Sequence, residues 1–432
     1  MDSIWTKEAA LPNFIELKGD TSADVLIVGG GIAGILCAYF LQEKGIDYIL
    51  VEGKTICSGV TENTTAKITS QHGLIYQELV EKAGIEKARM YLEANQNSVE
   101  KYSELCVDID CDFEPKPSYV YSLDNREKLE KEAEALRKIG FDAPVRETEE
   151  LPFATAGAVC FEKQAQFHPL KFLSQIARNL KIYEHTFVRE LAGHTAVTDR
   201  GNISFQKIIF TTHFPIDNKH GMYYLKMYQH RSYVIALENA ARLNGMYVDE
   251  SGYGLSFRNY KNMLLFGGGA HRTGKQGGGW QELRTLAEQY YPDAKESCFW
   301  ATQDCMTLDH IPYIGQYSKT MPDYFVATGF NKWGMTSSMT AAMILSDLMM
   351  GKENPYAEVF SPSRNMVKPQ LFINTWEAAV NLLTISGKRC PHLGCALKWN
   401  DAEHSWDCPC HGSRFDENGT VLDNPANGNL KK

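Results

Sequence analysis

A buried strand, a glycine turn and an apolar helix follow one another in Asp24-Val-Leu-Ile-Val-Gly29-Gly-Gly31-Ile-Ala-Gly34, with a second strand at Tyr48-Ile-Leu-Val-Glu52. In such a unit the first glycine permits a tight turn, the second lets the backbone approach a pyrophosphate, and the third lets the helix pack on the strand. An acid placed as Glu52 is can accept hydrogen bonds from an adenosine ribose. The sequence therefore predicts an α/β fold of Rossmann type, with a dinucleotide bound by Gly29, Gly31, Ile32, Ala33, Gly34 and Glu52.

Three later segments resemble the D-amino-acid oxidase superfamily of flavoproteins. Residues 58–73 resemble its flavin-contacting loop, residues 207–215 its later nucleotide-side strand, and residues 309–336 the approach to its second glycine turn. The resemblance covers about residues 23–354 and implies FAD, because a second turn of this kind places a helix N-terminus at the reduced, anionic flavin. The positions that match the family's cofactor contacts are Gly59, Thr64, Thr65, Ala66, Val188, Thr212, Gly329, Trp333, Gly334, Met335 and Thr336.

The same resemblance implies two interwoven domains within residues 1–355. The FAD-binding domain is expected to use about residues 22–85, 150–220 and 300–355. An α+β substrate domain is expected to use about residues 86–149 and 221–299. A linker with an amphipathic helix should follow at 356–385, and we expect this helix to pack against the FAD domain rather than to contact a membrane.

Members of this superfamily oxidise a C–N bond by moving a hydride to the flavin, so the resemblance implies a small-molecule amine or amino-acid substrate. Arg231 or Arg258 could clamp a substrate carboxylate, and Tyr233 could complete the pocket. A structural salt bridge is an equally good interpretation of each arginine. Lys67 and His72 lie in the flavin loop and are expected to contact cofactor or substrate.

Four cysteines and two histidines are concentrated near the C-terminal end, in Cys390-Pro-His392-Leu-Gly-Cys395 and Cys408-Pro-Cys410-His411-Gly-Ser413. A Rieske 2Fe-2S cluster needs two thiolates on one iron and two imidazoles on the other. The predicted ligands are Cys390, His392, Cys408 and His411. Structural zinc also accepts two cysteines and two histidines, but its ligand pairs are usually spaced by two to four residues, and zinc leaves the other cysteines unexplained.

These motifs resemble the respiratory-type Rieske proteins over about residues 386–430. The resemblance implies a disulfide between Cys395 and Cys410, a covering proline loop at Pro425-Ala426, and a hydrogen bond from Ser413 to a bridging sulfide. Phe415 stands where many members carry a tyrosine, which predicts a lower reduction potential. Only a few residues separate the expected linker helix from Cys390. The all-β Rieske domain at 386–432 is therefore expected to have a truncated base.

Composition narrows the class of protein. The chain has 432 residues and a formal net charge of −9, with acidic and basic residues interspersed, which argues against nucleic acid and anionic membrane as partners. No secretory signal or transmembrane segment is expected. The seven cysteines outside the motifs show no framework spacing and are typical of reduced thiols, so a cytoplasmic location is expected.

Two functions agree with these features. In the first, an FAD-dependent amine or amino-acid dehydrogenase passes electrons from reduced flavin to the Rieske cluster and then to a downstream acceptor. In the second, the protein is an electron-transfer or redox-sensing module that oxidises no amine. The complete flavin fingerprint and the full substrate domain favour the first.

Overall fold

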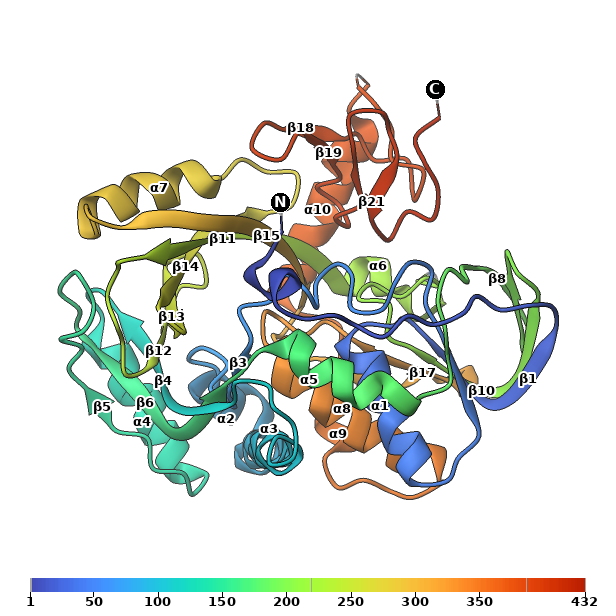
Figure 1. The fold of residues 1–432 in the computed structure, drawn as a ribbon, viewed down its shortest axis with the longest axis horizontal. Coiled ribbons are helices and arrows are strands. Elements are labelled where there is room, and N and C mark those ends of the chain that lie inside the picture. Colours follow the sequence, from blue (N-terminus) through green and yellow to red (C-terminus); the bar gives the residue numbers. More distant parts are fainter. Residues whose placement is uncertain (1, 219, 386, 432) are drawn as a thin grey trace.

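The computed structural model describes residues 2–218, 220–385 and 387–431; the expected domain ends at Met1, Ser386 and Lys432 lie outside the described residues. Figure 1 shows two large sheets surrounded by helices, with a small third sheet against one side of the molecule. The first sheet has the strand order β16-β17-β10-β1-β2-β7, with β8 and β9 beside β10. Its strands are β1 (Thr21–Val28), β2 (Tyr48–Val51), β7 (Ile182–Tyr183), β8 (Val188–Ala192), β9 (Thr195–Thr198), β10 (Asn202–Phe210), β16 (Tyr313–Ser318) and β17 (Met321–Thr328).

The expected strand–turn–helix–strand unit forms the centre of the first sheet. Strand β1 is parallel to both β2 and β10, and helix α1 (Ile32–Glu43) connects β1 to β2. Val25 to Val28 are all buried, as is typical of a parallel strand covered on both faces. Helices α1, α5 (Pro169–Ile176) and α8 (Gly334–Met349) contribute to one continuous core with this sheet, and α9 (Ala357–Phe360) packs beside them.

The second sheet forms the substrate domain. Its strand order is β15-β11-β14-β13-β12-β4-β6-β3, with β5 beside β6. The strands are β3 (Lys67–Ile68), β4 (Glu114–Ser122), β5 (Val145–Arg146), β6 (Gly157–Gln166), β11 (Met227–Glu238), β12 (Met246–Asp249), β13 (Ser256–Tyr260), β14 (Met263–Arg272) and β15 (Lys295–Thr307). The remaining helical elements of residues 4–290 are η1 (Ile4–Lys7), α2 (Tyr76–Ala83), α3 (Ile85–Leu105), α4 (Arg126–Lys138), η2 (Ala177–Asn179), η3 (His220–Met222), α6 (Tyr223–Lys226) and α7 (Gly279–Tyr290).

Three strands from segments expected in the FAD domain lie in this second sheet. Strand β6 pairs along its length with β4, and β3 pairs with β6. Strand β15 pairs with β11 from Lys295 to Thr307, so it crosses the expected boundary at residue 300. An apolar run predicts that a strand is buried, but it does not specify which of two sheets pairs with it.

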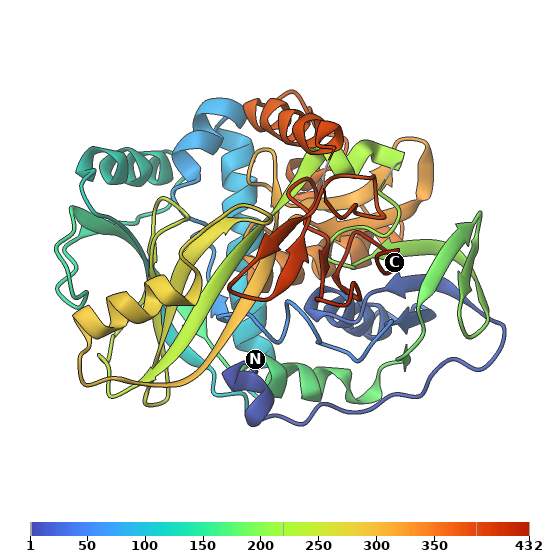
Figure 2. The same ribbon diagram turned by 90° about the horizontal axis from the view of Figure 1, so that it is seen from above.

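A small four-stranded antiparallel sheet lies in the C-terminal part of the chain, as expected for a Rieske domain with little base. Its strands are only two or three residues long: β18 (Lys398–Asn400), β19 (Ser405–Asp407), β20 (Arg414–Phe415) and β21 (Val421–Asp423). The core of this domain consists of Cys390, Cys395, Cys408 and Cys410 with Leu397, Phe415 and Ala426. Figures 1 and 2 place the domain over β11 and β15, near the junction of the two large sheets.

Helix α10 (Pro369–Leu383) precedes the cluster domain, at the predicted position. Its packing differs from the expectation, because Asn374 and Asn381 face the protein while Phe372 and Trp376 are exposed. The buried side of α10 contacts α6 and the cluster domain. Among the described residues, no helix is long and apolar enough to cross a membrane.

Candidate active site and cluster site

One large cavity, of about 1190 Å³, runs between the two large sheets. The β1–α1 turn, the loop after β2, the end of β10 and the turn before α8 line one side of it. Strands β11, β14 and β15 line another side, and residues 421–429 of the cluster domain reach its edge. Its size and its position at the end of a parallel sheet are those of a dinucleotide site.

The β1–α1 turn has the close backbone contacts that the glycine pattern predicts. Gly29 has φ +111°, and a Cβ atom on it would lie 2.7 Å from the carbonyl oxygen of Thr211. A Cβ atom on Gly34 would lie 1.9 Å from the carbonyl oxygen of Gly29. Glu52 accepts a hydrogen bond from the Gly30 amide at 2.7 Å and lies in the cavity wall. These residues therefore fit the pyrophosphate and ribose of FAD.

Most of the expected cofactor residues line the cavity, and three do not. Gly34 packs the helix on the turn, Ala66 is a fully buried residue with φ +55°, and Thr336 donates a hydrogen bond to the carbonyl oxygen of Thr69. The residues found in the wall are Gly29, Gly31, Ile32, Ala33, Glu52, Gly59, Thr64, Thr65, Val188, Thr212, Gly329, Trp333, Gly334 and Met335.

Lys67 lines the cavity among hydroxyl groups. Its Nζ lies 3.3 Å from Thr65 Oγ1 and 3.4 Å from Ser256 Oγ. Burial, with the nearby charge of Arg258, lowers the pKa of Lys67 to about 7. This amine therefore exchanges a proton near neutral pH, as a catalytic acid or base must.

His72 also lines the cavity, but its ring is fully engaged. Its Nδ1 lies 2.6 Å from the Tyr91 hydroxyl, its Nε2 lies 2.9 Å from Thr336 Oγ1, and its ring stacks on Trp333. Burial lowers its pKa to about 3, so the ring is neutral at pH 7. His72 consequently orients Trp333 and the start of α8.

Neither expected arginine is among the residues that line the cavity. Arg231 is paired with Glu403 of the cluster domain, and its Nε lies 2.9 Å from Glu403 Oε1. Arg258 donates to the carbonyl oxygens of Thr65 and Ala66, each at 2.7 Å. Arg231 is buried and held by a carboxylate, whereas Arg258 Nη2 is buried without a hydrogen-bond partner among the described residues. Because neither group belongs to the cavity wall, neither is placed to clamp a substrate carboxylate there.

Tyr233 is among the residues that line the cavity, but its hydroxyl group is occupied. The hydroxyl lies 2.9 Å from His271 Nε2, and the Tyr233 ring packs edge-on against Trp280.

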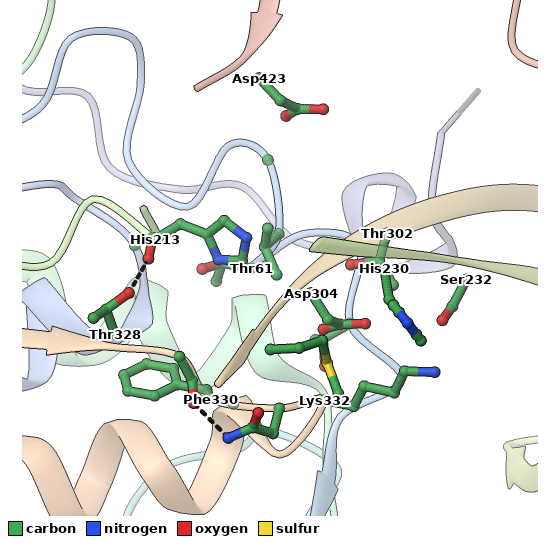
Figure 3. Close-up of a pocket in the computed structure, with 18 of the residues that line it drawn as sticks. Thr61, His213, His230, Ser232, Thr302, Asp304, Thr328, Phe330, Lys332 and Asp423 are labelled. Carbon is green, nitrogen blue, oxygen red and sulfur yellow. Dashed lines mark hydrogen bonds between the residues drawn. The ribbon is translucent and has the colours of Figure 1, made fainter. Parts of the chain in front are cut away.

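The structure brings together a polar group that the sequence did not single out. Figure 3 shows His230, Ser232, Thr302, Asp304 and Lys332 together at the cavity. Among the described residues, His230 Nδ1, Ser232 Oγ and Thr302 Oγ1 are buried without a hydrogen-bond partner. Burial raises the pKa of Asp304 and lowers that of Lys332, with each opposing the shift of the other. Unpartnered buried polar atoms beside a cavity indicate a ligand site.

Strand alternation explains why the sequence does not identify these residues. On β11, Gln229 and Arg231 face the cluster domain, while His230 and Ser232 face the cavity. On β15, Asp304 pairs with His230 and Thr302 pairs with Ser232. Successive side chains of a strand point to opposite faces, so an error of one residue selects the wrong face.

The two cluster loops have the same local geometry. The carbonyl oxygen of Cys390 accepts from the Gly394 amide, and that of Cys408 accepts from the Gly412 amide, each at 2.9 Å. The sulfur atoms of Cys395, Cys408 and Cys410 lie within 4.8 Å of one another. All 11 cysteines are free thiols in the structure, so the expected Cys395–Cys410 disulfide is not formed there.

Both predicted histidine ligands come from these loops. The rings of His392 and His411 have centroids 5.0 Å apart, and His392 Nε2 lies 2.9 Å from Asn218 Oδ1, a contact that would fix its ring. His411 Nδ1 is buried and has no hydrogen-bond partner among the described residues. Burial, with His392 and Arg272 nearby, lowers the pKa of His411 to about 3, which keeps the imidazole in the neutral form that binds metal. These residues fit a histidine-ligated iron.

Ser413 and Phe415 support the second loop. Ser413 Oγ accepts from the Ala426 amide at 3.0 Å, which joins the second cluster loop to the loop at Pro425-Ala426. Phe415 is fully buried and pairs with Trp406 across β19 and β20.

A direct contact joins the cluster domain to the cavity. Gln229 donates from Nε2 to the carbonyl oxygen of His411 at 2.9 Å, while its Oε1 lies 3.1 Å from Nε2 of His213 in the cavity wall. Gln303 donates to the carbonyl oxygen of Gly412 at 2.9 Å. Asn424 binds the same segment, donating to the carbonyl oxygens of Thr212 and Phe214, which flank His213.

Comparisons with known proteins agree with both halves of the chain. The family described as FAD dependent oxidoreductase (DAO) matches residues 24–348, and the family described as Rieske 2Fe-2S domain matches residues 370–432. YhfW of Bacillus subtilis (strain 168), named as a Rieske 2Fe-2S iron-sulfur protein, is 36% identical over 495 aligned positions that cover all of this chain and 97% of YhfW.

Three further matches each cover one of the two parts of the chain. Cytochrome b6-f complex iron-sulfur subunit 2 of Trichormus variabilis is 52% identical over 42 residues, which are 10% of this chain and 24% of that protein. Among solved structures, glycine oxidase from Geobacillus kaustophilus has a TM-score of 0.66 at 20% identity, covering 80% of this chain and 99% of that one. L-proline dehydrogenase from P. horikoshii also has a TM-score of 0.66, at 16% identity, covering 81% and 98%.

The solved structures show the fold, and the family matches show the cofactors to be FAD and a Rieske 2Fe-2S cluster rather than zinc. The chain therefore belongs to the DAO family of FAD-dependent oxidoreductases and carries a Rieske 2Fe-2S domain at its C-terminal end.

Proposed function

We propose that this protein is a cytoplasmic FAD-dependent dehydrogenase that oxidises the C–N bond of an amino acid or amine and passes the electrons to its Rieske cluster and then to a downstream acceptor. Bound FAD supplies a two-electron hydride acceptor, and the cluster takes one electron at a time. The observation that carries the proposal is the contact of Gln229 with both His213 in the cavity wall and the backbone of His411.

The group of polar residues at β11 and β15 would bind the substrate. His230, Ser232 and Thr302 present buried polar atoms without partners, and each such atom costs about 1–3 kcal/mol until it is hydrogen-bonded. An amine nitrogen or a carboxylate oxygen would provide the missing partners. Lys332 is a half-buried cation in the cavity wall whose Nζ donates to the carbonyl oxygen of Gly252 at 2.8 Å, and it would take the place of Arg231 and Arg258 as the partner of a substrate anion.

Lys67 would accept the proton that a substrate ammonium group must lose before its carbon can give up a hydride. A lysine with a pKa of about 7 is partly neutral at physiological pH and can therefore act as a base. Ser256 and Thr65 hold its amino group from two sides. Trp333, positioned by His72, would shape the pocket beside the N-terminus of α8.

Neighbouring residues of β11 and β15 lie on opposite faces of the sheet and would therefore have separate roles. His230, Ser232, Thr302 and Asp304 line the cavity, while Gln303 binds the backbone of the second cluster loop. Only the thickness of one sheet therefore separates the substrate group from the cluster domain. A short path of this kind is what one-electron transfer between two bound centres requires.

Anaerobic reduction of the bound flavin by a panel of amines and amino acids tests the proposal. At least one compound should bleach the flavin. The Ser232→Ala/Thr302→Val double variant should slow that bleaching at least about tenfold, because two hydrogen bonds to the substrate are lost. Ser318→Ala/Thr320→Val, in the exposed β16–β17 turn, is the matched control. If no compound bleaches the flavin and a reduced one-electron carrier does, the electron-transfer or redox-sensing alternative is correct.

A further inference from the structure

Helix α10 turns its apolar side away from the protein. We use the name apolar ridge for Phe372, Ile373, Trp376, Val380 and Leu383, which lie on one face of this helix and are between 42% and 79% exposed. Val367 and Ile385, just beyond the two ends of α10, are also exposed. Contiguous apolar surface of this kind indicates a binding site.

Specific contacts on the polar side of α10 fix this orientation. Asn374 accepts from Arg272 Nη1 at 3.1 Å and donates to the carbonyl oxygen of Leu225 at 3.3 Å. The carbonyl oxygen of Asn381 accepts from the Ala396 amide at 2.9 Å. An ordinary surface helix buries its apolar stripe, and α10 does the opposite.

The charge of the segment around α10 indicates what kind of surface would bind to the apolar ridge. Residues 361–400 contain five basic side chains and one acidic side chain, Glu377. Arg364 is paired with Asp309 at 2.8 Å and Glu377 with Lys275 at 2.7 Å, which leaves Lys368, Lys388, Arg389 and Lys398 as the unmatched charges. This segment therefore has a net charge of +4 in a chain of −9, and the remaining residues carry −13. The even distribution assumed from the sequence does not hold here, and an anionic surface would be attracted to this face while the rest of the protein is repelled.

We propose that α10 binds the surface of an anionic lipid bilayer, with the helix lying in the plane of the interface and the apolar ridge inserted. The helix has 15 residues, and no described helix could cross a bilayer. Aromatic and aliphatic residues on one side are typical of an interfacial helix, and the basic residues of this segment lie just before and after α10, at Lys368, Lys388 and Arg389. A second copy of the chain would bring two segments of +4 together, so like-charge repulsion opposes a dimer through this ridge.

The position of α10 gives this binding a consequence for the cluster domain. Glu377 presents its carbonyl oxygen 3.9 Å from Cys410 Sγ, and Ala378 packs against the cysteine core. Figure 2 shows α10 along the outer rim of the molecule, beside α6. Docking through α10 would bring the cluster domain to the lipid surface, where the downstream acceptor would then be found. The proposal does not depend on which substrate the cavity binds.

Flotation of the holoprotein with vesicles tests this proposal. We expect binding to vesicles of phosphatidylcholine with phosphatidylglycerol and much weaker binding to phosphatidylcholine alone. The Phe372→Ser/Trp376→Ser double variant should weaken binding at least about tenfold, because the inserted side chains are lost. Lys388→Ala/Lys398→Ala should weaken it roughly fivefold or more for each charge removed. Matched controls are Val107→Ser/Leu123→Ser for the apolar change and Lys18→Ala/Lys319→Ala for the charge change, all at exposed positions away from α10.

Three results would overturn the proposal. The first is failure of the wild-type holoprotein to float with the anionic vesicles. The second is binding that the ridge variant retains in full, since another surface would then be responsible. The third is a concentration-dependent dimer in sedimentation velocity that the ridge variant abolishes in the absence of lipid, which would assign the ridge to a second copy of the chain.

Discussion

At the scale of single residues, three cations differ in what surrounds them. Among the described residues, the hydrogen-bond partners of Lys67 Nζ are two hydroxyl groups, and burial lowers the pKa of this amine. Arg231 has a carboxylate partner, and Arg258 has two carbonyl oxygens. The sequence offers all three as candidates, Lys67 by its place in the flavin loop and the two arginines by their expected strands. The structure distinguishes them, because Lys67 lines the cavity and the two arginines do not.

Replacement of Lys67 tests whether its amine acts as a base. For Lys67→Met we expect kcat/KM to fall about a hundredfold and the rise in rate through pH 7 to disappear. Lys18→Met, at an exposed position, should leave the pH profile unchanged. A variant that keeps the same rise near pH 7 would show that another group titrates there.

The same pKa shift predicts the sign of a stability effect. Because burial lowers the pKa of Lys67 from 10.5 to about 7, the unfolded chain binds more protons than the folded chain between these values. The stability contributed at this position therefore rises with pH across that window. The unfolding free energy of the wild type minus that of Lys67→Met should therefore become more positive between pH 7 and 10, as measured by urea unfolding.

Replacement of Gly34 tests whether the β1–α1 turn binds the dinucleotide. A methyl group at this position would overlap the carbonyl oxygen of Gly29, at 1.9 Å, so Gly34→Ala should distort the turn and empty the site of FAD. Gly45→Ala is the control, since no atom lies within 4 Å of its added Cβ and only its positive φ opposes the change. Flavin absorbance per chain measures the result, and full occupancy in Gly34→Ala would contradict this account of the turn.

At the scale of elements, β11 shows what a strand pattern predicts and where it is insufficient. Residues 229–235 are recognisable as a strand, and the structure places them within β11. Which face meets the cavity depends on pairing with β15 and on the cluster domain, which covers the other face. The sequence therefore leaves a substrate clamp and a structural salt bridge equally open for Arg231, and in the structure it pairs with Glu403, 172 positions later. A contact between distant segments leaves no local periodicity to detect.

The buried pair of Arg231 and Glu403 should hold the cluster domain on β11. Burial alone would raise the pKa of Glu403, but Arg231 and Arg414 lower it to about 2. Arg231→Ala should weaken the domain contact by about 3–5 kcal/mol, because Glu403 stays buried and loses one of its two cations. Limited proteolysis near residues 384–390 should become faster while FAD stays bound.

An apolar replacement of both partners separates charge from packing. Arg231→Met/Glu403→Met should restore protection compared with Arg231→Ala, because no unpaired charge remains buried. For the wild-type protein, the folded pKa lies below the ordinary value of 4.5, so this stabilisation is complete above that pH and is lost as the pH falls towards 2. Equal proteolysis rates for all three proteins would show that the ion pair does not hold the domain.

At the scale of the whole molecule, two recognisable halves meet at an interface that neither half predicts. The glycine pattern predicts the first half and the cysteine–histidine pattern the second, because in each the ligand chemistry requires particular residues at a fixed spacing. Their junction depends on Gln229 and His411, which are 182 positions apart, and on close packing at Gly412. A Cβ atom on Gly412 would lie 2.7 Å from the side chain of Gln229, so this glycine lets the cluster loop approach the strand.

From this junction we predict that one substitution at the cluster separates reduction of the flavin by substrate from electron transfer to an acceptor. Cys408→Ser removes a predicted iron ligand, whereas Gln229 and the cavity-wall residue His213 that it contacts are untouched. We expect substrate to reduce the flavin at nearly the wild-type rate in stopped-flow measurements, and turnover with a one-electron acceptor to slow at least about tenfold.

The wild-type protein, purified anaerobically, should contain about two irons and two sulfides per chain, and the variant should contain less. Cys298→Ser, at a cysteine outside the cluster domain, controls for the loss of a thiol. If Cys408→Ser lacks the cluster and still serves a one-electron acceptor as fast as wild type, electrons leave the flavin by another route, and the cluster has a structural or sensing role.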